Sequence, residues 1–284
     1  MTQKHPIILG AHMSIAGGIE NAYLSGASID CTAIQLFTHS NRQWAIKELS
    51  ADTIEKVQAA QQQTGITHAV VHASYLINVA STDAETRRKS KNMLHMELNH
   101  CAALGINFLV LHPGSNPSIE EGCKLISEAI NETFEKNSSK VTILLENMAG
   151  QGSQIGYRLE QLATLRQEIS AKKRIGFCID TCHLWAAGYD FSDHTGYHKV
   201  LKEVDSILGI EHIHAIHLND SKQKLNSQVD RHANIGAGTI GLEAFRLIMN
   251  DPKLKNIPKI LETPGKELHE YAHNMKILLD LVKS

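Results

Sequence analysis

The chain has 284 residues, of which 42% are hydrophobic and 20% are charged. This composition is typical of a globular protein and excludes a disordered tail, a collagen-like fibre and a coiled coil. Lys and Arg (28) nearly balance Asp and Glu (30), giving a formal charge of −2. A bulk basic surface for nucleic acid is therefore excluded, and any such binding needs a local patch or bound cations.

Features of membrane and secreted proteins are missing from the sequence. No stretch reaches the ~18 consecutive apolar residues of a membrane span. The segment Met1–Pro6 leads into only a short apolar run, Ile7–Leu9, which is far below a signal-peptide core. Five scattered cysteines do not form the pattern of a disulfide scaffold. We expect a monomeric cytoplasmic protein that does not associate with membranes and keeps its thiols reduced.

Short runs of Ile, Val and Leu alternate with longer amphipathic stretches along the whole chain. The runs predict strands that end near His12, Phe37, His72, His112, Glu146, Asp180, His217 and Glu262. The amphipathic stretches predict helices at 18–28, 52–64, 83–104, 119–136, 158–170, 194–208, 241–250 and 267–282. Continuous apolar strands that alternate with helices indicate a parallel sheet covered by helices.

The number of strand–helix units favours a closed barrel. Eight predicted units fill the chain, and no linker rich in Pro, Gly or Ser divides it. The predicted fold class is therefore α/β, an eight-stranded (β/α)8 TIM barrel that forms a single domain over residues 1–284. An open doubly wound sheet is the alternative. Its dinucleotide-binding version is disfavoured because no Gly-x-Gly-x-x-Gly follows the first strand.

Six of the predicted strand ends carry a residue type that binds metals: His72, His112, Glu146, Asp180, His217 and Glu262. The C-terminal ends of barrel strands form one face, where active sites lie. The two-residue period of a strand places His217 on the same side as Ile213 and Ala215, with His212 and His214 on the other side. Glu146 likewise shares its side with Thr142 and Leu144.

Three further ligand types follow predicted strands: His183, Asp230 and His232. Carboxylates at the ends of apolar strands are costly to bury without a cation or a partner. Mixed imidazole and carboxylate ligands suit zinc, and manganese or iron with lower preference. The nine candidates exceed one tetrahedral zinc site and suit two or three ions with a bridging carboxylate. Paired metals about 3.5–4 Å apart are the usual apparatus for in-line displacement at phosphorus.

Other histidines and cysteines have a simpler interpretation. We expect the helix histidines to lie on solvated faces: His95, His100, His198, His269 and His273. Cys178 and Cys182 flank Asp180, so a zinc thiolate is conceivable, but we interpret both as packing thiols.

Two predicted loops carry residues of the kind that grip nucleic acid. Arg42 follows the second strand, and Tyr75 and Leu76 follow the third. An exposed aromatic or aliphatic side chain can wedge into a base stack while an arginine holds phosphate. This signal is weak by itself, because a loop aromatic is usually a packing residue.

Three segments of the chain resemble the signatures of a known family. The segments HASYLIN, GFCIDTCH and HLNDSK…VDRH are similar to those of endonuclease IV, the zinc-dependent apurinic/apyrimidinic endonucleases of base excision repair. The similarity runs from GAHMSIAGG to the final helix. It implies an eight-stranded barrel with three zinc ions per chain. The implied activity is hydrolysis of the phosphodiester 5′ to an abasic site in double-stranded DNA, giving 3′-hydroxyl and 5′-deoxyribose phosphate ends, together with cleaning of blocked 3′ ends.

The resemblance also assigns the ligands and the DNA contacts. The first zinc would be held by His72, His112 and Glu146, with Glu146 also the catalytic residue that bridges to the second zinc. Asp180, His217 and Glu262 would complete the second site. The third would consist of His183, Asp230 and His232. Tyr75 and Leu76 resemble the residues that the family inserts at the lesion, and Arg42 the one that fills the gap in the base stack.

Four positions depart from the family pattern without removing a ligand. Ala73 and Ala237 stand where the family can carry acids, and Met148 replaces a threonine. Asn226 occupies a usual glycine position, although Asn tolerates a left-handed turn better than most residues. These changes affect the expected grip on DNA and the rate rather than the chemistry.

Two alternatives remain open from the sequence. A metal-dependent sugar isomerase or epimerase on the same barrel would need only Glu146, Asp180, His217 and Glu262. A non-catalytic, metal-stabilised barrel that binds damaged DNA would have no use for an open site of several metals. The additional ligands and the Tyr75–Leu76 loop favour the endonuclease over both.

Overall fold

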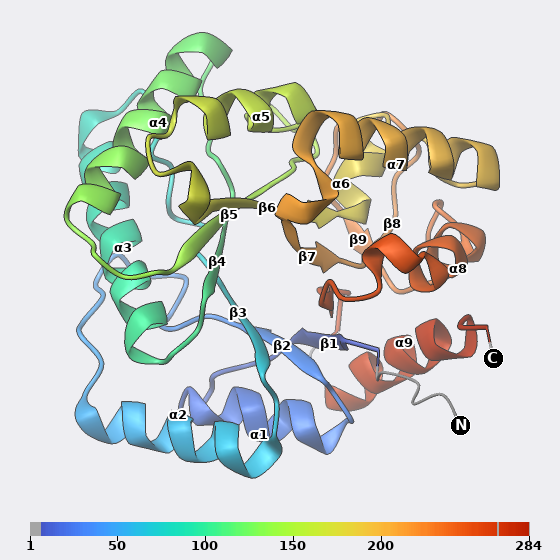
Figure 1. Cartoon of the computed structure of the whole chain (residues 1–284), viewed down its shortest axis with the longest axis horizontal. Helices are drawn as coiled ribbons and strands as arrows, with labels where there is room; N and C mark the ends of the chain where they lie inside the picture. The colour runs from blue at the N-terminus through green and yellow to red at the C-terminus, as the bar shows by residue number, and fades with distance from the viewer. Residues whose placement is uncertain (1–6, 266, 284) are drawn as a thin grey trace.

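The computed structural model describes residues 7–265 and 267–283, so the Met1–Pro6 segment considered above lies outside the described residues. Its parallel strands close into a barrel in the order β1-β10-β7-β6-β5-β4-β3-β2 (Figure 1). The barrel strands are β1 (Leu9–His12), β2 (Ala33–Leu36), β3 (His68–His72), β4 (Phe108–Leu111), β5 (Thr142–Glu146), β6 (Ile175–Asp180), β7 (Ile213–His217) and β10 (Lys259–Leu261). The predicted closed barrel is confirmed.

Helices surround the barrel on the outside, as Figure 1 shows. They are α1 (Glu20–Ser28), α2 (Ala51–Thr64), α3 (Ala84–Ala103), α4 (Ile119–Glu135), α5 (Leu159–Glu168), α6 (Thr181–Ala186), α7 (His194–Leu208), α8 (Leu242–Asn250) and α9 (Leu268–Asp280). Their starts follow sequence signals, because the side chains of Ser50, Asp83, Ser118 and Asp193 accept hydrogen bonds from backbone N–H groups in the first turns. No helix in the described ranges combines the length and apolarity needed to cross a membrane.

Each predicted helix exists, with both ends within two residues of the prediction. A short helix and a two-stranded hairpin were not anticipated. The short helix α6 follows β6 directly, and the two-residue strands β8 (Asp220–Ser221) and β9 (His232–Ala233) pair antiparallel beside the barrel. Both unanticipated elements lie at the C-terminal end of the barrel strands, where they hold His183 and His232.

The barrel interior contains a small apolar layer below its C-terminal end. This lower layer consists of Val70, Val110, Leu144, Cys178 and Ala215. Each member precedes one of the candidate ligands by two residues on its strand. Residues two positions apart on a strand point to the same side. The candidate ligands therefore point into the barrel like the lower layer, and they meet at its C-terminal end.

His214 in β7 does not lie on the side of the strand that the sequence predicted. The pairing of β6 with β7 shifts register, so that Phe177 and Cys178 pair with Ile213 and Ala215. The extra residue, His214, stacks on Phe108 with ring centroids 5.0 Å apart, next to the lower layer. A Cβ at Gly176 would lie 2.5 Å from the His214 ring, so glycine makes this arrangement possible. The prediction that His214 faces away from the interior is therefore wrong, because a β-bulge breaks the two-residue period.

Candidate metal centre

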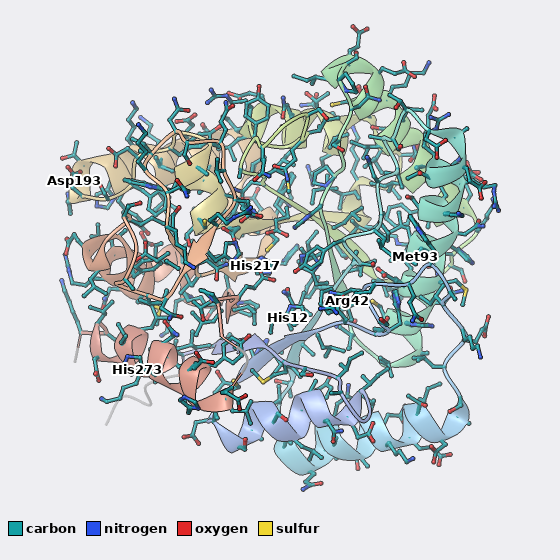
Figure 2. The ribbon with its side chains drawn as sticks, turned by 180° about the vertical axis from the view of Figure 1, so that it is seen from behind. His12, Arg42, Met93, Asp193, His217 and His273 are labelled. Atoms are coloured by element: carbon teal, nitrogen blue, oxygen red, sulfur yellow. The ribbon has the colours of Figure 1, made fainter. Side chains whose placement is uncertain are left out.

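The structure brings the nine predicted ligands together at the C-terminal end of the barrel. They fall into three groups whose ligand atoms lie within 4.8 Å of one another: His72 with His112 and Glu146; Glu146 with Asp180, His217 and Glu262; and His183 with Asp230 and His232. Figure 2 shows His217 toward the middle of the molecule, whereas Asp193 and His273 lie at its periphery. The lower layer positions the first two groups, and α6 and the β8–β9 hairpin bring in the third.

Glu146 connects the first two groups. Its Oε2 lies 3.3 Å from His72 Nε2 and 3.2 Å from His112 Nε2, while its Oε1 lies 3.0 Å from His217 Nδ1. The side chain of Glu146 is fully buried. A carboxylate that directs one oxygen to each of two ligand groups has the geometry of a bridging ligand.

The second and third groups extend from this centre. His217 Nδ1 lies 3.3 Å from Glu262 Oε2 and 3.9 Å from Asp180 Oδ2. In the third group, Asp230 places one carboxylate oxygen 3.2 Å from His183 Nε2 and the other 3.3 Å from His232 Nε2. His232 Nε2 also lies 3.7 Å from Asp180 Oδ2, so the three groups form one continuous cluster.

Hydrogen bonds to the outer ring nitrogens orient four of the histidines. His72, His183 and His232 each place Nδ1 beside a backbone carbonyl oxygen, at 2.7, 2.9 and 3.0 Å respectively. A ring nitrogen that donates to an oxygen carries the proton, which leaves the lone pair of the neutral ring on the nitrogen that faces the cluster. Such outer contacts are characteristic of metal-binding histidines.

His217 has the opposite ring orientation. Its Nε2 donates to Gln35 Oε1 at 2.8 Å, which leaves Nδ1 for the cluster. Gln35 also donates from Nε2 to Glu262 Oε1 at 2.6 Å, and it is itself fully buried. One amide side chain therefore fixes two members of the second group.

Several atoms at the centre of the cluster have no hydrogen-bond partner although they are buried: Glu146 Oε2, His183 Nε2 and His232 Nε2. Buried polar atoms are normally paired, because an unpaired one loses the free energy of its hydration. Here the unpaired atoms are lone-pair donors that face one another across the groups. This donor set fits cations.

The pKa values of the cluster show how strongly its members depend on one another. Burial favours neutral His183 and His217, but the carboxylates beside His183, and Cys178 with two carboxylates beside His217, outweigh burial and hold both imidazole pKa values well above the ordinary value. Burial also favours neutral Glu146 and Glu262, yet the surrounding histidines keep both carboxyl pKa values well below the ordinary value. The carboxylates therefore stay ionised and available to a cation, which on binding would displace the inner proton of His183 and His217 and free their lone pairs.

Residues next to the ligands were missed by the sequence analysis. Asn219 donates to Asp180 Oδ2 at 2.7 Å and accepts from the Glu262 backbone N–H at 2.8 Å. The Asn147 side chain accepts from the Asp180 backbone N–H at 2.7 Å. His12, whose buried Nε2 has no partner, lies 3.5 Å from Glu262 through Nδ1. The available signal was a polar residue beside a ligand at a strand end, as in LEN and HLND.

The cysteines are buried thiols. Burial raises the pKa values of Cys178 and Cys182 to about 12, so both are protonated near neutral pH. Cys178 belongs to the lower layer of the interior, as a packing thiol should. Cys182 lies close to Asp180 and His232, and these three side chains form a further group that could hold a metal, so a thiolate ligand stays an alternative to the packing interpretation.

Of the predicted loop residues, Tyr75 lies beside the candidate metal site. Tyr75 is 56% exposed, and its ring packs edge-on against Phe37 and is tilted against His72, with centroids 5.5 and 5.2 Å away. Leu76 is half-buried and Arg42 is exposed. Figure 2 shows Arg42 on the same side of the molecule as His12, near the centre of the view. An aromatic side chain that borders a metal-type site and remains largely exposed is available to a ligand.

Two features of the surrounding turns bear on the predicted departures. Asn226 adopts a φ of 59°, the left-handed conformation that was expected of it. The Gly-rich turn that contains Ala237 wraps a buried carboxylate: Asp220 accepts backbone hydrogen bonds from Gly236 and Gly238 at 3.0 and 3.1 Å. A Cβ at Gly238 would lie 2.3 Å from Asp220 Oδ1, so this turn is built for a side chain of the chain itself.

Comparison with known proteins identifies the family. Residues 26–281 match the model of the xylose isomerase-like TIM barrels. The Chloroflexus aggregans protein named Probable endonuclease 4 is 45% identical over 278 residues, 96% of this chain and 97% of the relative. The chain belongs to the endonuclease IV family. A protein of the same name from Citrifermentans bemidjiense is 44% identical over 97% of this chain and 99% of its own length.

Solved structures agree with this assignment. Endonuclease IV from Thermus thermophilus superposes with a TM-score of 0.86 at 36% identity, covering 97% of this chain and 98% of the other. A D-tagatose 3-epimerase-like protein superposes with a TM-score of 0.71 at 19% identity, covering 96% of each chain. The second likeness concerns the barrel fold alone.

Proposed function

We propose that this endonuclease IV family member is a zinc-dependent DNA-repair enzyme. It hydrolyses the phosphodiester 5′ to an abasic site in double-stranded DNA, leaving a 3′-hydroxyl and a 5′-deoxyribose phosphate. The observation that carries the proposal is the continuous cluster of three ligand groups, in which Glu146 connects the first two and the contact of Asp180 with His232 connects the third. The family membership and the names of the relatives support the same activity. Removal of blocking groups from 3′ ends follows, because it is the same chemistry at another phosphodiester.

The donor set suits three zinc ions. His72, His112 and Glu146 would hold the first, Glu146 with Asp180, His217 and Glu262 the second, and His183 with Asp230 and His232 the third. Bound zinc lowers the pKa of water toward ~7 and stabilises negative charge that develops on phosphate and leaving-group oxygens.

The protein's own residues organise the reacting centre. Glu146 spans the first two groups and fixes their separation. The carbonyl oxygens and Gln35 hold the histidine rings in the tautomers that present a lone pair. This preorganisation means that the ligands need little rearrangement when charge develops in the transition state. No Ser or Cys nucleophile is required for direct hydrolysis, in keeping with the protonated state of Cys178 and Cys182.

Lesion recognition is assigned to the rim. Tyr75 and Leu76 would enter the base stack beside the abasic site, and Arg42 would fill the gap they create. Three Zn²⁺ ions would change the formal charge of the whole protein from −2 to +4, and the added positive charge would lie at this face, where it favours the DNA backbone. A monomeric state and a cytoplasmic location remain predictions from the sequence.

The first test combines elemental analysis with cleavage of a duplex that contains a single tetrahydrofuran abasic analogue. About three zinc ions per chain and one cut 5′ to the analogue are expected. One or two metals, no cut and turnover of free ketoses would instead support the sugar epimerase alternative. Binding of the abasic duplex without cutting, at full zinc content, would support a damaged-DNA binding protein.

A further inference from the structure

A buried carboxylate outside the metal cluster has no role in the chemistry above. Glu97 lies in α3 and is only 1% exposed. An ionised carboxylate is costly to bury unless strong partners compensate for the lost hydration. The partners of Glu97 therefore indicate what the residue does.

Glu97 contacts two loops through one oxygen atom. Its Oε1 accepts a hydrogen bond from the Ser74 backbone N–H at 3.0 Å and from His39 Nε2 at 2.7 Å. Ser74 immediately precedes Tyr75, and His39 lies three residues before Arg42. The carboxylate therefore joins the β2–α2 loop to the β3–α3 loop, the two loops that carry the proposed DNA contacts.

Both ring nitrogens of His39 have an oxygen atom within hydrogen-bond distance. Its Nδ1 lies 2.9 Å from the Ser40 carbonyl oxygen, while Nε2 faces Glu97. Both nitrogens thus face oxygen atoms, so the ring is held between the backbone of its own loop and the side chain of Glu97.

A histidine of α3, His100, adds further contacts to the β2–α2 loop. His100 is 2% exposed, so the prediction of a solvated face was wrong for this residue. Its Nδ1 lies 2.9 Å from Thr38 Oγ1 and its Nε2 lies 2.8 Å from the Lys47 carbonyl oxygen. These contacts hold the β2–α2 loop on both sides of Arg42. The two loops also touch directly, because Ser74 Oγ donates to the Asn41 carbonyl oxygen at 3.3 Å.

Stability alone does not explain the carboxylate. The second oxygen of Glu97, Oε2, is buried without a hydrogen-bond partner. An unpaired buried oxygen costs free energy that an apolar side chain would avoid. A residue kept at this cost, and bonded to the two loops at the rim, is better explained by the position of those loops.

We propose that Glu97 is a positioning residue that locks the loop of Arg42 and the loop of Tyr75 and Leu76 in one relative placement. The inference rests on the proposed function, since it concerns how the same site meets DNA. Two loops that are already aligned lose less conformational entropy when they bind, so affinity for the lesion rises. Glu97 acts through the loops and does not touch the reacting atoms.

The test compares three variants of the zinc-loaded, full-length protein. Glu97→Ala removes both contacts, and His39→Ala removes only the contact to the β2–α2 loop. Ser90→Ala is the matched control. Ser90 is also a fully buried α3 residue, and its Oγ accepts from the Asn78 N–H in the middle of the β3–α3 loop, beyond Tyr75 and Leu76. If Glu97→Ala fails to fold, His39→Ala still tests the β2–α2 half of the lock.

Hydrogen exchange measures the loops without DNA. For Glu97→Ala, exchange should accelerate about tenfold in residues 38–47 and 73–76, since loss of about one strong hydrogen bond corresponds to that factor. His39→Ala should accelerate only residues 38–47, and Ser90→Ala neither segment. Unchanged exchange in Glu97→Ala would overturn the proposal.

DNA cleavage then separates positioning from a merely structural role. For the tetrahydrofuran duplex, Glu97→Ala should raise KM about tenfold, with kcat within about twofold of wild type and zinc content unchanged. Faster exchange with an unchanged KM would show that the lock is structural only, and would overturn the proposal. A wild-type protein that does not cut the duplex would refute the proposed function itself. A wild-type protein that cuts, with a Glu97→Ala variant of unchanged KM, would refute only this inference.

Discussion

Two neighbouring layers of the barrel interior have opposite chemistry although they come from the same strands. The lower layer, defined by Val70, Val110, Leu144, Cys178 and Ala215, is apolar and almost fully buried. Two residues further along the same strands lie His72, His112, Glu146, Asp180 and His217, which are mostly buried as well. Within two residues along each strand, the interior thus changes from a packed apolar core to a cluster of charged and polar candidate ligands.

This difference separates stability from function. Apolar side chains fill the lower layer at high density and fix the positions of the strands. The upper layer instead keeps unpaired buried atoms such as Glu146 Oε2, which a packed core would not tolerate. The lower layer therefore serves as the rigid base on which the ligands of the upper layer are held. Substitutions in the two layers should separate activity from stability.

The largest effect is expected in the upper layer. Glu146→Gln keeps the size of the side chain and removes the charge that connects the first two ligand groups. Cleavage of the abasic duplex should fall by at least about 10³-fold, while the free energy of unfolding changes by about 1–2 kcal/mol. Steady-state cleavage and urea unfolding measure the two quantities. Near-native cleavage at full zinc content would refute the role of Glu146.

In the lower layer we expect a large loss of stability instead of a direct loss of catalysis. Leu144→Ala should lower the free energy of unfolding by about 3 kcal/mol, because it leaves a cavity in the lower layer. Leu145→Ala is the matched control: Leu145 is equally buried on the same strand but packs against the outer core. Both variants should lose similar stability in urea. Only Leu144→Ala should also weaken zinc retention against a chelator, and equal retention would show that the lower layer does not support the site.

Lys259, at the start of β10, is a buried charged residue outside the carboxylate cluster. It therefore shows the effect of burying a charge away from the candidate ligands. Lys259 donates to the carbonyl oxygens of Leu254 and Ile257, and burial lowers its pKa from 10.5 to about 8. The unfolded chain therefore binds this proton up to higher pH than the folded chain does. Lys259 should accordingly destabilise the fold below about pH 8, and the protein should gain stability as the pH rises from about 8 to 10.5.

Lys259→Met isolates this contribution. The difference in the free energy of unfolding between wild type and variant should change by up to about 3 kcal/mol across that window. Urea unfolding at about pH 7 and about pH 10 measures it. A difference that does not depend on pH would show that Lys259 keeps an ordinary pKa in the folded protein.

The smallest change in stability is expected for ion pairs that are exposed to solvent. Glu132 pairs with Lys91 at 2.6 Å and with Lys136 at 2.8 Å, yet its side chain is 41% exposed. Solvent screens such pairs, so Glu132→Gln should change the free energy of unfolding by less than about 1 kcal/mol and leave cleavage unchanged. Thermal unfolding provides the measurement. A loss as large as that of Leu144→Ala would mean that ion pairs, and not the apolar layer, stabilise the barrel.

Much of the molecule was predictable because its pattern is local and repetitive. The alternation of apolar runs with amphipathic stretches predicted each barrel strand and its helix. The ligand candidates stood out because a carboxylate or imidazole at the end of an apolar strand is unusual. His214 and His100 were misplaced for different reasons. A bulge displaced the first, and buried acceptors in a neighbouring loop recruited the second.

The sequence by itself determined the barrel and the set of candidate ligand residues, because strand periodicity and residue type can be read from neighbouring positions in the chain. Only the tertiary structure decided which residues share a group, since Glu146 and His217 are brought within 3.0 Å by strand order rather than by proximity in the chain. The same holds for Gln35, which contacts Glu262 and His217 from another strand, and for Glu97, which reaches two loops from a helix. Hydrogen bonds between distant segments depend on how the layers pack, and a single residue type in the sequence does not reveal them.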